Sequence, residues 1–218
     1  RFKQCTKSEL QKMKQTKLLW WIILVIAHSG CHEQVQNAGE YTAWLLDKDN
    51  GFIKQKCFNN ICIATKYLPP DYQALKAHNK NKLSSYDSLL QNYSKSISFL
   101  MEFSPDKEHG DIMYKDVLTP EDYQQKVLNL NFGMEKRVSL LVDDKTYKPA
   151  LATFENTYGA NETKIVSLLF VPTDSTDKAL FLSDTLDIEL YDDIFFTGIT
   201  HYVFTRNKLN NTPTIFIP

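Results

Sequence analysis

The chain has 218 residues, of which 43% are hydrophobic, 12% aromatic and 23% charged, a composition typical of a folded globular protein. This aromatic content excludes an intrinsically disordered chain, and a count of only 7 glycines excludes a collagen-like or glycine-rich sequence. Residues 1–30 hold six of the 25 basic and one of the 26 acidic residues, so the remainder has a net charge of −6, which argues against a nucleic-acid partner.

The amino-terminal segment has the pattern of an export signal. After Met13 come two lysines and then an apolar run from Leu18 to Ala27. Three further residues separate this run from Cys31. Ten apolar residues rise only about 15 Å as a helix, roughly half of a bilayer's hydrocarbon core. We therefore predict a signal peptide over residues 13–30, with residues 1–12 upstream of it or at a fragment boundary. An uncleaved anchor is the alternative.

The residues before Cys31 resemble a lipobox, in which signal peptidase II cuts before a cysteine that receives a diacylglyceryl group. Ser29 and Gly30 fit that pattern, while His28 stands where an aliphatic residue is usual. The resemblance implies lipidation of Cys31, which makes the lipid bilayer a partner. The polar residues 31–43 then form a tether, and residues 44–218 form a single β-rich domain.

The segment from Phe52 to Tyr67 predicts a β-hairpin. Asn59-Asn60 suits a two-residue turn because asparagine tolerates positive φ, and Cys57 and Cys62 then face each other across the two strands. A disulfide between them and a pair of free thiols both fit this geometry. We expect no metal site, because one cysteine pair without a nearby histidine falls short of four zinc ligands.

Helices are expected next along the chain. Pro69-Pro70 ends the hairpin, Asp71 can cap a helix, and apolar residues recur at helical spacing from Leu83 to Ile97. Ile97 to Phe103 is strand-like, and Thr119-Pro120 begins a further helix.

After Lys136 the sequence consists of short segments rich in β-branched and aromatic residues, separated by turn residues. We expect strands at 138–142, 150–158, 164–171, 186–190, 194–196, 202–205 and 214–217. The predicted fold is mainly β with inserted helices (α+β), with a β-sandwich-like C-terminal half.

Residues 13–76 resemble a group of uncharacterised lipoproteins of Bacteroidetes-type bacteria. The resemblance lies in the lipobox-like start, Trp44, Asn50-Gly51, the lysine pair Lys54 and Lys56, the hairpin, and the segment from Lys66 to Leu75. The group has no assigned activity, so the resemblance implies a location in the cell envelope and no catalytic mechanism.

Motifs for nucleotide binding, zinc proteases and serine hydrolases are missing from the sequence, and no cofactor is expected. The histidines His78, His109 and His201 are isolated in the sequence. Two groups of residues are weaker candidates: Asp143-Asp144 with Asp192-Asp193 as glycosidase carboxylates, and Tyr191, Phe195 and Phe196 as a sugar-binding platform.

These observations predict an envelope lipoprotein, anchored to the outer membrane with the periplasmic side favoured, that acts as a binding or assembly module. Its partner would be an envelope protein or a glycan. The alternative is an envelope hydrolase, directed at glycans or peptides, that uses acidic residues such as Asp143 or Asp192.

Overall fold

The computed structural model describes residues 34–35, 37–106, 110–155 and 162–215, and the fold lies within the unit Val35–Pro218. The helices are α2 Ala38–Leu46, α3 Pro70–Lys80, α4 Tyr86–Tyr93, α5 Pro120–Phe132, α6 Met134–Arg137, α7 Ala179–Leu182 and α8 Arg206–Leu209, with 3-10 turns η1 Lys48–Asn50 and η2 Ile112–Tyr114. The strands are β1 Gln34–Val35, β2 Ile53–Phe58, β3 Ile61–Leu68, β4 Ile97–Pro105, β5 Val138–Val142, β6 Lys145–Tyr147, β7 Leu151–Glu155, β8 Lys164–Phe170, β9 Thr185–Asp192, β10 Gly198–Thr205 and β11 Thr214–Ile215.

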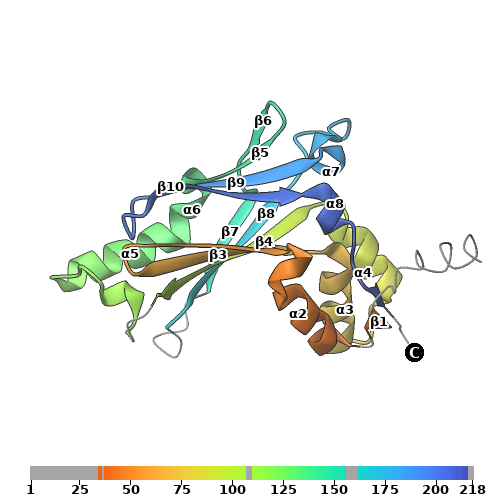
Figure 1. The fold of residues 1–218 in the computed structure, drawn as a ribbon, viewed down its shortest axis with the longest axis horizontal. Helices are drawn as coiled ribbons and strands as arrows, with labels where there is room; N and C mark the ends of the chain where they lie inside the picture. The colour runs from red at the N-terminus through yellow and green to blue at the C-terminus, as the bar shows by residue number, and fades with distance from the viewer. Residues whose placement is uncertain (1–33, 36, 107–109, 156–161, 216–218) are drawn as a thin grey trace, which may run out of the picture. The chain divides into compact units, whose positions relative to one another are not determined.

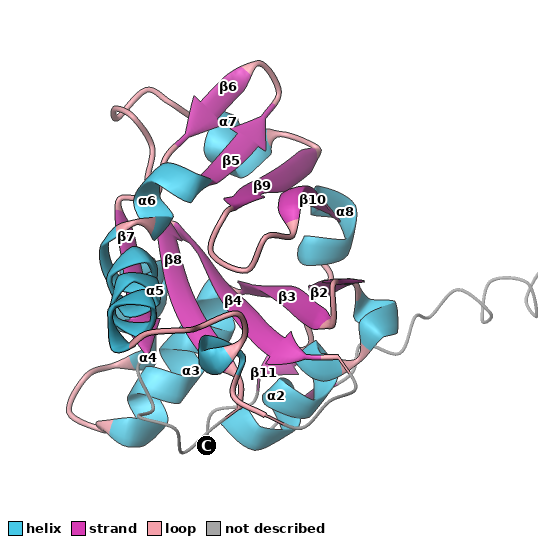
Figure 2. Cartoon of the chain, turned by 90° about the vertical axis from the view of Figure 1, so that its left-hand side faces the viewer, coloured by secondary structure: helices cyan, strands magenta, loops and turns pink. Residues whose placement is uncertain are grey.

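Two antiparallel sheets form the body of the fold. The first has the strand order β2-β3-β4-β8-β7 and the second β10-β9-β5-β6, and they lie one above the other (Figures 1 and 2). The predicted class, a mainly β fold with inserted helices and sandwich-like sheets, is confirmed. The five-stranded sheet also takes three strands from the N-terminal half, because β4 pairs with β8 in the register Phe99↔Leu168.

The core lies between the two sheets. Alternate residues of β4 point inward, so Phe99, Met101 and Phe103 are fully buried while Glu102 is only half-buried. The ring of Phe99 meets that of Phe204 from β10 with centroids 5.3 Å apart. These inward-facing side chains belong to one continuous cluster, which supplies most of the hydrophobic stabilisation.

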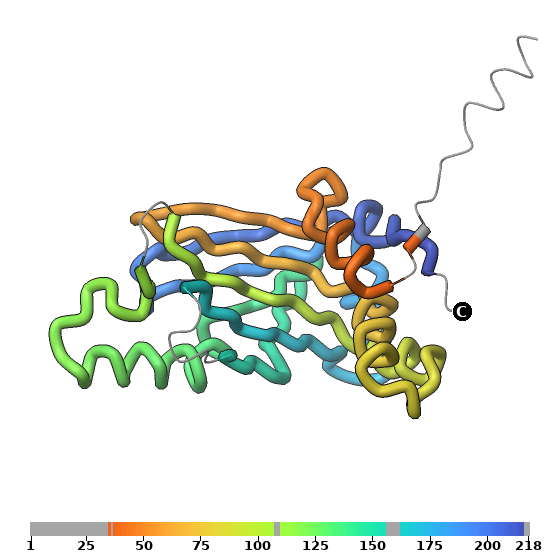
Figure 3. The backbone as a smooth tube through the Cα atoms, turned by 90° about the horizontal axis from the view of Figure 1, so that it is seen from below, coloured from red at the N-terminus to blue at the C-terminus, as the bar shows by residue number. Residues whose placement is uncertain are grey.

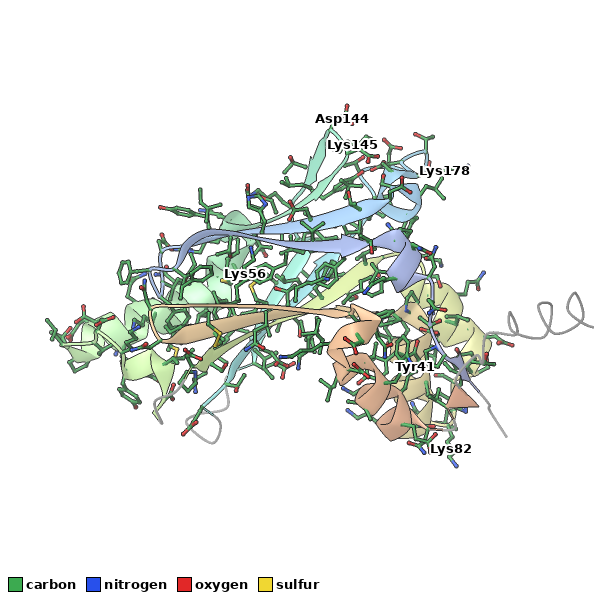
Figure 4. The ribbon with its side chains drawn as sticks, in the orientation of Figure 1. Tyr41, Lys56, Lys82, Asp144, Lys145 and Lys178 are labelled. Atoms are coloured by element: carbon green, nitrogen blue, oxygen red, sulfur yellow. A yellow bond between two sulfur atoms is a disulfide. The ribbon has the colours of Figure 1, made fainter. Side chains whose placement is uncertain are left out.

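Edge strands β2 and β10 lie beside each other along one side of the sandwich (Figure 4). The ammonium groups of Lys54 and Lys56 on β2 lie 5.9 Å and 5.8 Å from the ring centroids of Phe204 and Tyr202 on β10. Their aliphatic stems therefore help to cover rings that would otherwise face water at this edge.

Helices α2, α3 and α4 gather at one end of the five-stranded sheet, and α5 lies at the other end (Figure 1). Helix α2 begins at Ala38, so the tether predicted over residues 31–43 is wrong for the residues from Ala38 onward. Asn37 caps it by accepting a hydrogen bond from the Glu40 amide at 3.0 Å. Tyr41 is fully buried, donates to the Asp71 carboxylate at 2.8 Å, and has its pKa raised above the usual range, chiefly by burial.

No helix in the described part of the chain is long and apolar enough to cross a bilayer. The predicted signal peptide, the upstream residues and Cys31 lie outside the described residues.

Candidate binding site at a three-loop tip

The turn between β2 and β3 has the geometry expected from its sequence. Asn59 and Asn60 have φ values of 50° and 64°, and Phe58 pairs with Ile61 to close the turn. One step further from the turn, Cys57 and Cys62 pair and form a disulfide, which resolves the two alternatives left open by the sequence. Ile61 is buried below the turn, whereas the side chain of Phe58 remains 40% exposed.

The loop between β9 and β10 is organised by one buried carboxylate. Asp192 accepts hydrogen bonds from the amides of Ile194 and Phe195, both at 3.0 Å, and from the amide and hydroxyl of Thr197 at 3.2 Å and 2.6 Å. Asp192 is therefore fully engaged in holding its own loop, which is a structural role.

This carboxylate-held loop places two successive phenylalanines in opposite environments. Phe195 is buried and packs against Phe103 with ring centroids 5.3 Å apart. Phe196 has φ 59°, a left-handed conformation that is unfavourable for a bulky residue, and its side chain is 66% exposed. Backbone strain of this kind occurs preferentially at sites that hold ligands.

The segment from Asp111 to Thr119 forms the third loop. Ile112 and Met113 are buried beneath it, while Tyr114 is 65% exposed. The ring of Tyr114 stacks on Tyr123 of α5 with centroids 5.0 Å apart and an interplanar angle of 27°. Tyr114 therefore presents a flat aromatic face whose orientation is fixed by the helix below it.

Hydrogen bonds join these loops into one unit, which we name the three-loop tip and define as residues 57–62, 110–119 and 192–198. The Asn59 side-chain amide donates to the Phe196 carbonyl at 3.1 Å. The ammonium group of Lys115 donates to the Asn59 carbonyl, and that of Lys126 on α5 donates to the Lys115 carbonyl. The β2–β3 turn and the β9–β10 loop lie side by side in Figures 1 and 3.

The predicted aromatic platform is therefore rearranged. Of its three residues, Phe196 belongs to the exposed surface of the three-loop tip, Phe195 belongs to the core, and Tyr191 is 54% exposed on the outer face of β9. The additional aromatic groups at the tip are Phe58 and Tyr114, which no local sequence pattern indicates as binding residues.

The two acidic pairs do not form one site. Antiparallel pairing of β5 with β9 puts the Asp143-Asp144 turn beyond one end of this strand pair and Asp192 at the other end. About seven residues of strand separate them, or roughly 23 Å, whereas inverting glycosidases need at most about 9.5 Å. In Figure 4, Asp144 lies at the outer end of the β5–β6 hairpin, away from Lys56. Asp193 is bound by the Arg137 guanidinium, with one contact at 3.1 Å.

The histidines also differ from the expectation of isolation. His201 Nδ1 lies 2.9 Å from the Asp187 carboxylate, and His201 Nε2 lies 3.7 Å from the Glu189 carboxylate. His78 contacts the Ser84 carbonyl at 2.9 Å. Cross-strand pairing creates the His201 contacts, so spacing in the sequence could not reveal them. His109 lies outside the described residues.

A hollow lies on the outer face of the five-stranded sheet, where α2 packs near strands β3 and β4. It has a volume of about 210 Å³ between α2 and the sheet, and its lining includes Leu45, Phe52 and Leu100. At its rim, Lys66 and Glu102 form an ion pair of 2.6 Å, one charge of each sign. The lining is mainly apolar, and two of its polar side chains, Thr42 and Tyr72, hydrogen-bond to each other at 3.1 Å.

No family model and no curated protein matches the chain. Among solved structures, a protein of unknown function from Burkholderia pseudomallei K96243 is similar, with 14% sequence identity and a TM-score of 0.39. The match covers 79% of this chain and 90% of that one.

Proposed function

We propose that this chain is a lipid-anchored envelope protein that binds carbohydrate through the three-loop tip. The anchor is inferred from the lipobox-like residues before Cys31, and the binding role from the geometry of the tip.

Phe196 carries the binding part of the proposal. An exposed phenylalanine would relax to a conformation with negative φ if nothing held it, since the left-handed region costs about 1–2 kcal/mol. Four hydrogen bonds to Asp192 keep the loop in this form and leave the ring facing solvent. Such pre-organisation lowers the entropic cost of binding.

Carbohydrate fits the chemistry of the tip better than other ligand classes do. The exposed rings of Phe58, Tyr114 and Phe196 match the apolar faces of sugar rings, and the side chains of Asn59 and Asn60 can serve hydroxyl groups. An anionic ligand is less suited, because Asp111, Asp116 and Asp193 accompany the basic groups there.

The direction of the chain also suits this function. Cys31 precedes α2 by a few residues, and within the fold α2 lies at the end opposite the three-loop tip (Figure 1). A lipid on Cys31 would therefore be attached only a few residues along the chain from the helix at that end.

The test is calorimetric titration of the purified protein with chito-, manno- and gluco-oligosaccharides. We expect at least one of these to bind, and Phe196→Ala to weaken that binding about tenfold, the loss of roughly 1.4 kcal/mol expected for a stacked ring. Tyr191→Ala is the matched control, because Tyr191 is an exposed aromatic outside the tip. Failure of every sugar to bind, or equal losses in the two variants, would refute the carbohydrate proposal.

A further inference from the structure

Three potential metal ligands converge beside the β2–β3 turn. One ligand atom from each of Cys57, Cys62 and Asp106 lies within 4.8 Å of the other two. The cysteines come from β2 and β3, and Asp106 directly follows β4, the next strand of the same sheet. The Asp106 amide donates to the Asn60 carbonyl at 3.0 Å, and this hydrogen bond holds Asp106 beside the turn.

The sulfur atoms are joined in a disulfide in the structure, and in that state they do not act as thiolate ligands. We propose that reduction of this disulfide creates a site for a divalent metal ion of the zinc class, with Cys57, Cys62 and Asp106 as its protein ligands. This proposal does not rest on carbohydrate binding or on lipidation at Cys31, although Cys57 and Cys62 belong to the three-loop tip.

The distances suit tetrahedral coordination. With zinc–sulfur and zinc–oxygen bonds of about 2.3 Å and 2.0 Å, a sulfur and an oxygen ligand lie roughly 3.5 Å apart. The Cys62 sulfur lies 3.4 Å from the nearer Asp106 carboxylate oxygen. The two sulfurs must separate to roughly 3.8 Å, which directly opposed residues of an antiparallel pair allow once the bond between them is broken.

The surroundings leave the site accessible. Cys57 is exposed, so a reductant and a metal ion can reach its sulfur from solvent. A hollow of about 410 Å³ is lined by both cysteines, Ser104 and Asp106, which provides space for a water molecule as the fourth ligand. No lysine or arginine in the described ranges pairs with Asp106, so its carboxylate is not already neutralised by a cation there.

The redox step requires a dithiol reductant, whose two thiols become a disulfide as the Cys57–Cys62 disulfide becomes two thiols. Metal binding then deprotonates both thiols and releases two protons, so affinity should increase with pH. The oxidised chain holds the turn with a covalent bond, and the reduced chain would hold it with a metal ion.

The experiment is titration of the full chain with Cd²⁺, a spectroscopic probe for zinc sites, before and after reduction with a phosphine. The readout is the ultraviolet charge-transfer band between thiolate and metal. We expect a stoichiometric band only after reduction. Cys5 and Cys31 provide a background, which the variant with both Cys57→Ser and Cys62→Ser measures.

Asp106→Asn tests the third ligand, and Asp116→Asn is its matched control, since Asp116 is also exposed but does not belong to the cluster. Loss of the carboxylate should weaken Cd²⁺ binding at least tenfold, while the control should bind as the wild type does. Equal Cd²⁺ affinity in the Asp106→Asn and Asp116→Asn variants would exclude Asp106 as a ligand. A band in the double serine variant as intense as that of the reduced wild type would overturn the proposal as a whole.

Discussion

The side-chain amide of Asn59 donates a hydrogen bond of 3.1 Å to the carbonyl oxygen of Phe196, which lies 137 residues later in the chain. The same asparagine accepts a hydrogen bond from Lys115 through its own carbonyl. A turn residue selected for positive φ thus also joins the β9–β10 loop and the segment before α5. The shape of the three-loop tip therefore depends on a residue that local sequence rules assign only to a turn.

This dependence can be measured with Asn59→Gly, which preserves the positive φ and removes the side-chain amide. We expect the free energy of unfolding to fall by about 1 kcal/mol more than in Asn60→Gly, because only the Asn59 amide bonds to the opposite loop. Urea unfolding of both variants gives this difference. Indistinguishable midpoints would show that the bond contributes nothing to stability.

The strain at Phe196 predicts opposite effects on stability and binding. Phe196→Gly should raise the free energy of unfolding by about 1 kcal/mol, since glycine adopts φ 59° without steric cost. Phe196→Ala retains the strained Cβ and should leave stability nearly unchanged. Both variants should lose carbohydrate affinity. A Phe196→Gly variant less stable than the alanine variant would contradict the assignment of strain.

Thr65 is fully buried on the inner face of β3, and its hydroxyl has no hydrogen-bond partner among the described atoms. A buried hydroxyl without a partner costs desolvation energy that an isosteric methyl group avoids. We expect Thr65→Val to raise the free energy of unfolding by about 1 kcal/mol in urea titrations. In the control Thr200→Val, the hydroxyl removed is a donor to Tyr202, and stability should not rise.

Asp177 should make stability sensitive to acid. The ammonium of Lys145, 2.8 Å away, is the main cause of a pKa well below the usual value of 3.8, and the Tyr147 hydroxyl and Thr173 contribute further hydrogen bonds. The ionised form is thus favoured more in the folded than in the unfolded state. Its contribution is complete at neutral pH and is lost as the pH falls below about 4 towards the folded-state pKa.

Asp177→Asn removes this ionisation. We expect the variant to be less stable than the wild type at pH 7 and to lose less stability between about pH 5 and pH 3, as urea midpoints will report. Asp144→Asn, at an exposed position in the β5–β6 turn, is the control and should follow the wild type. Parallel acid profiles for all three proteins would exclude Asp177 as a source of acid sensitivity.

The proposed anchor predicts a covalent change at Cys31. Intact mass of the expressed wild type should show loss of residues 1–30 and gain of acyl mass, and the protein should fractionate with membranes. Cys31→Ala should show neither change. Identical masses and fractionation for the two proteins would exclude lipidation.

Local sequence patterns predicted the elements whose signals are contained in a few neighbouring residues. Asn59-Asn60 specified its turn and the register of β2 and β3, and Thr119 caps α5 through a reciprocal hydrogen-bond pair with Asp122. Helix α2 was missed because its nine residues include Gly39 and only two of them, Tyr41 and Leu45, are buried, which leaves a weak apolar stripe. The pairing of β4 with β8 joins distant segments, which no local pattern can specify.

The candidate site was predicted only in part for the same reason. Phe196 was a candidate for a sugar-binding platform together with Tyr191 and Phe195. The sequence did not distinguish it from Phe195, since the Asp192 hydrogen bonds decide which ring faces the core. Phe58 and Tyr114 join Phe196 through contacts of Asn59 and Lys115 that span long stretches of chain. A loop site of this kind is defined by tertiary structure.

The lysines of β2 affect whether two copies of the protein can pair through their sheet edges. An edge strand has backbone groups without partners on one side, so it can pair with a strand of another molecule and start aggregation. Lys54 and Lys56 lie on such a strand, beside the equally unpaired edge of β10. Two copies approaching through β2 would bring their ammonium groups together, and this repulsion opposes edge-to-edge pairing between them.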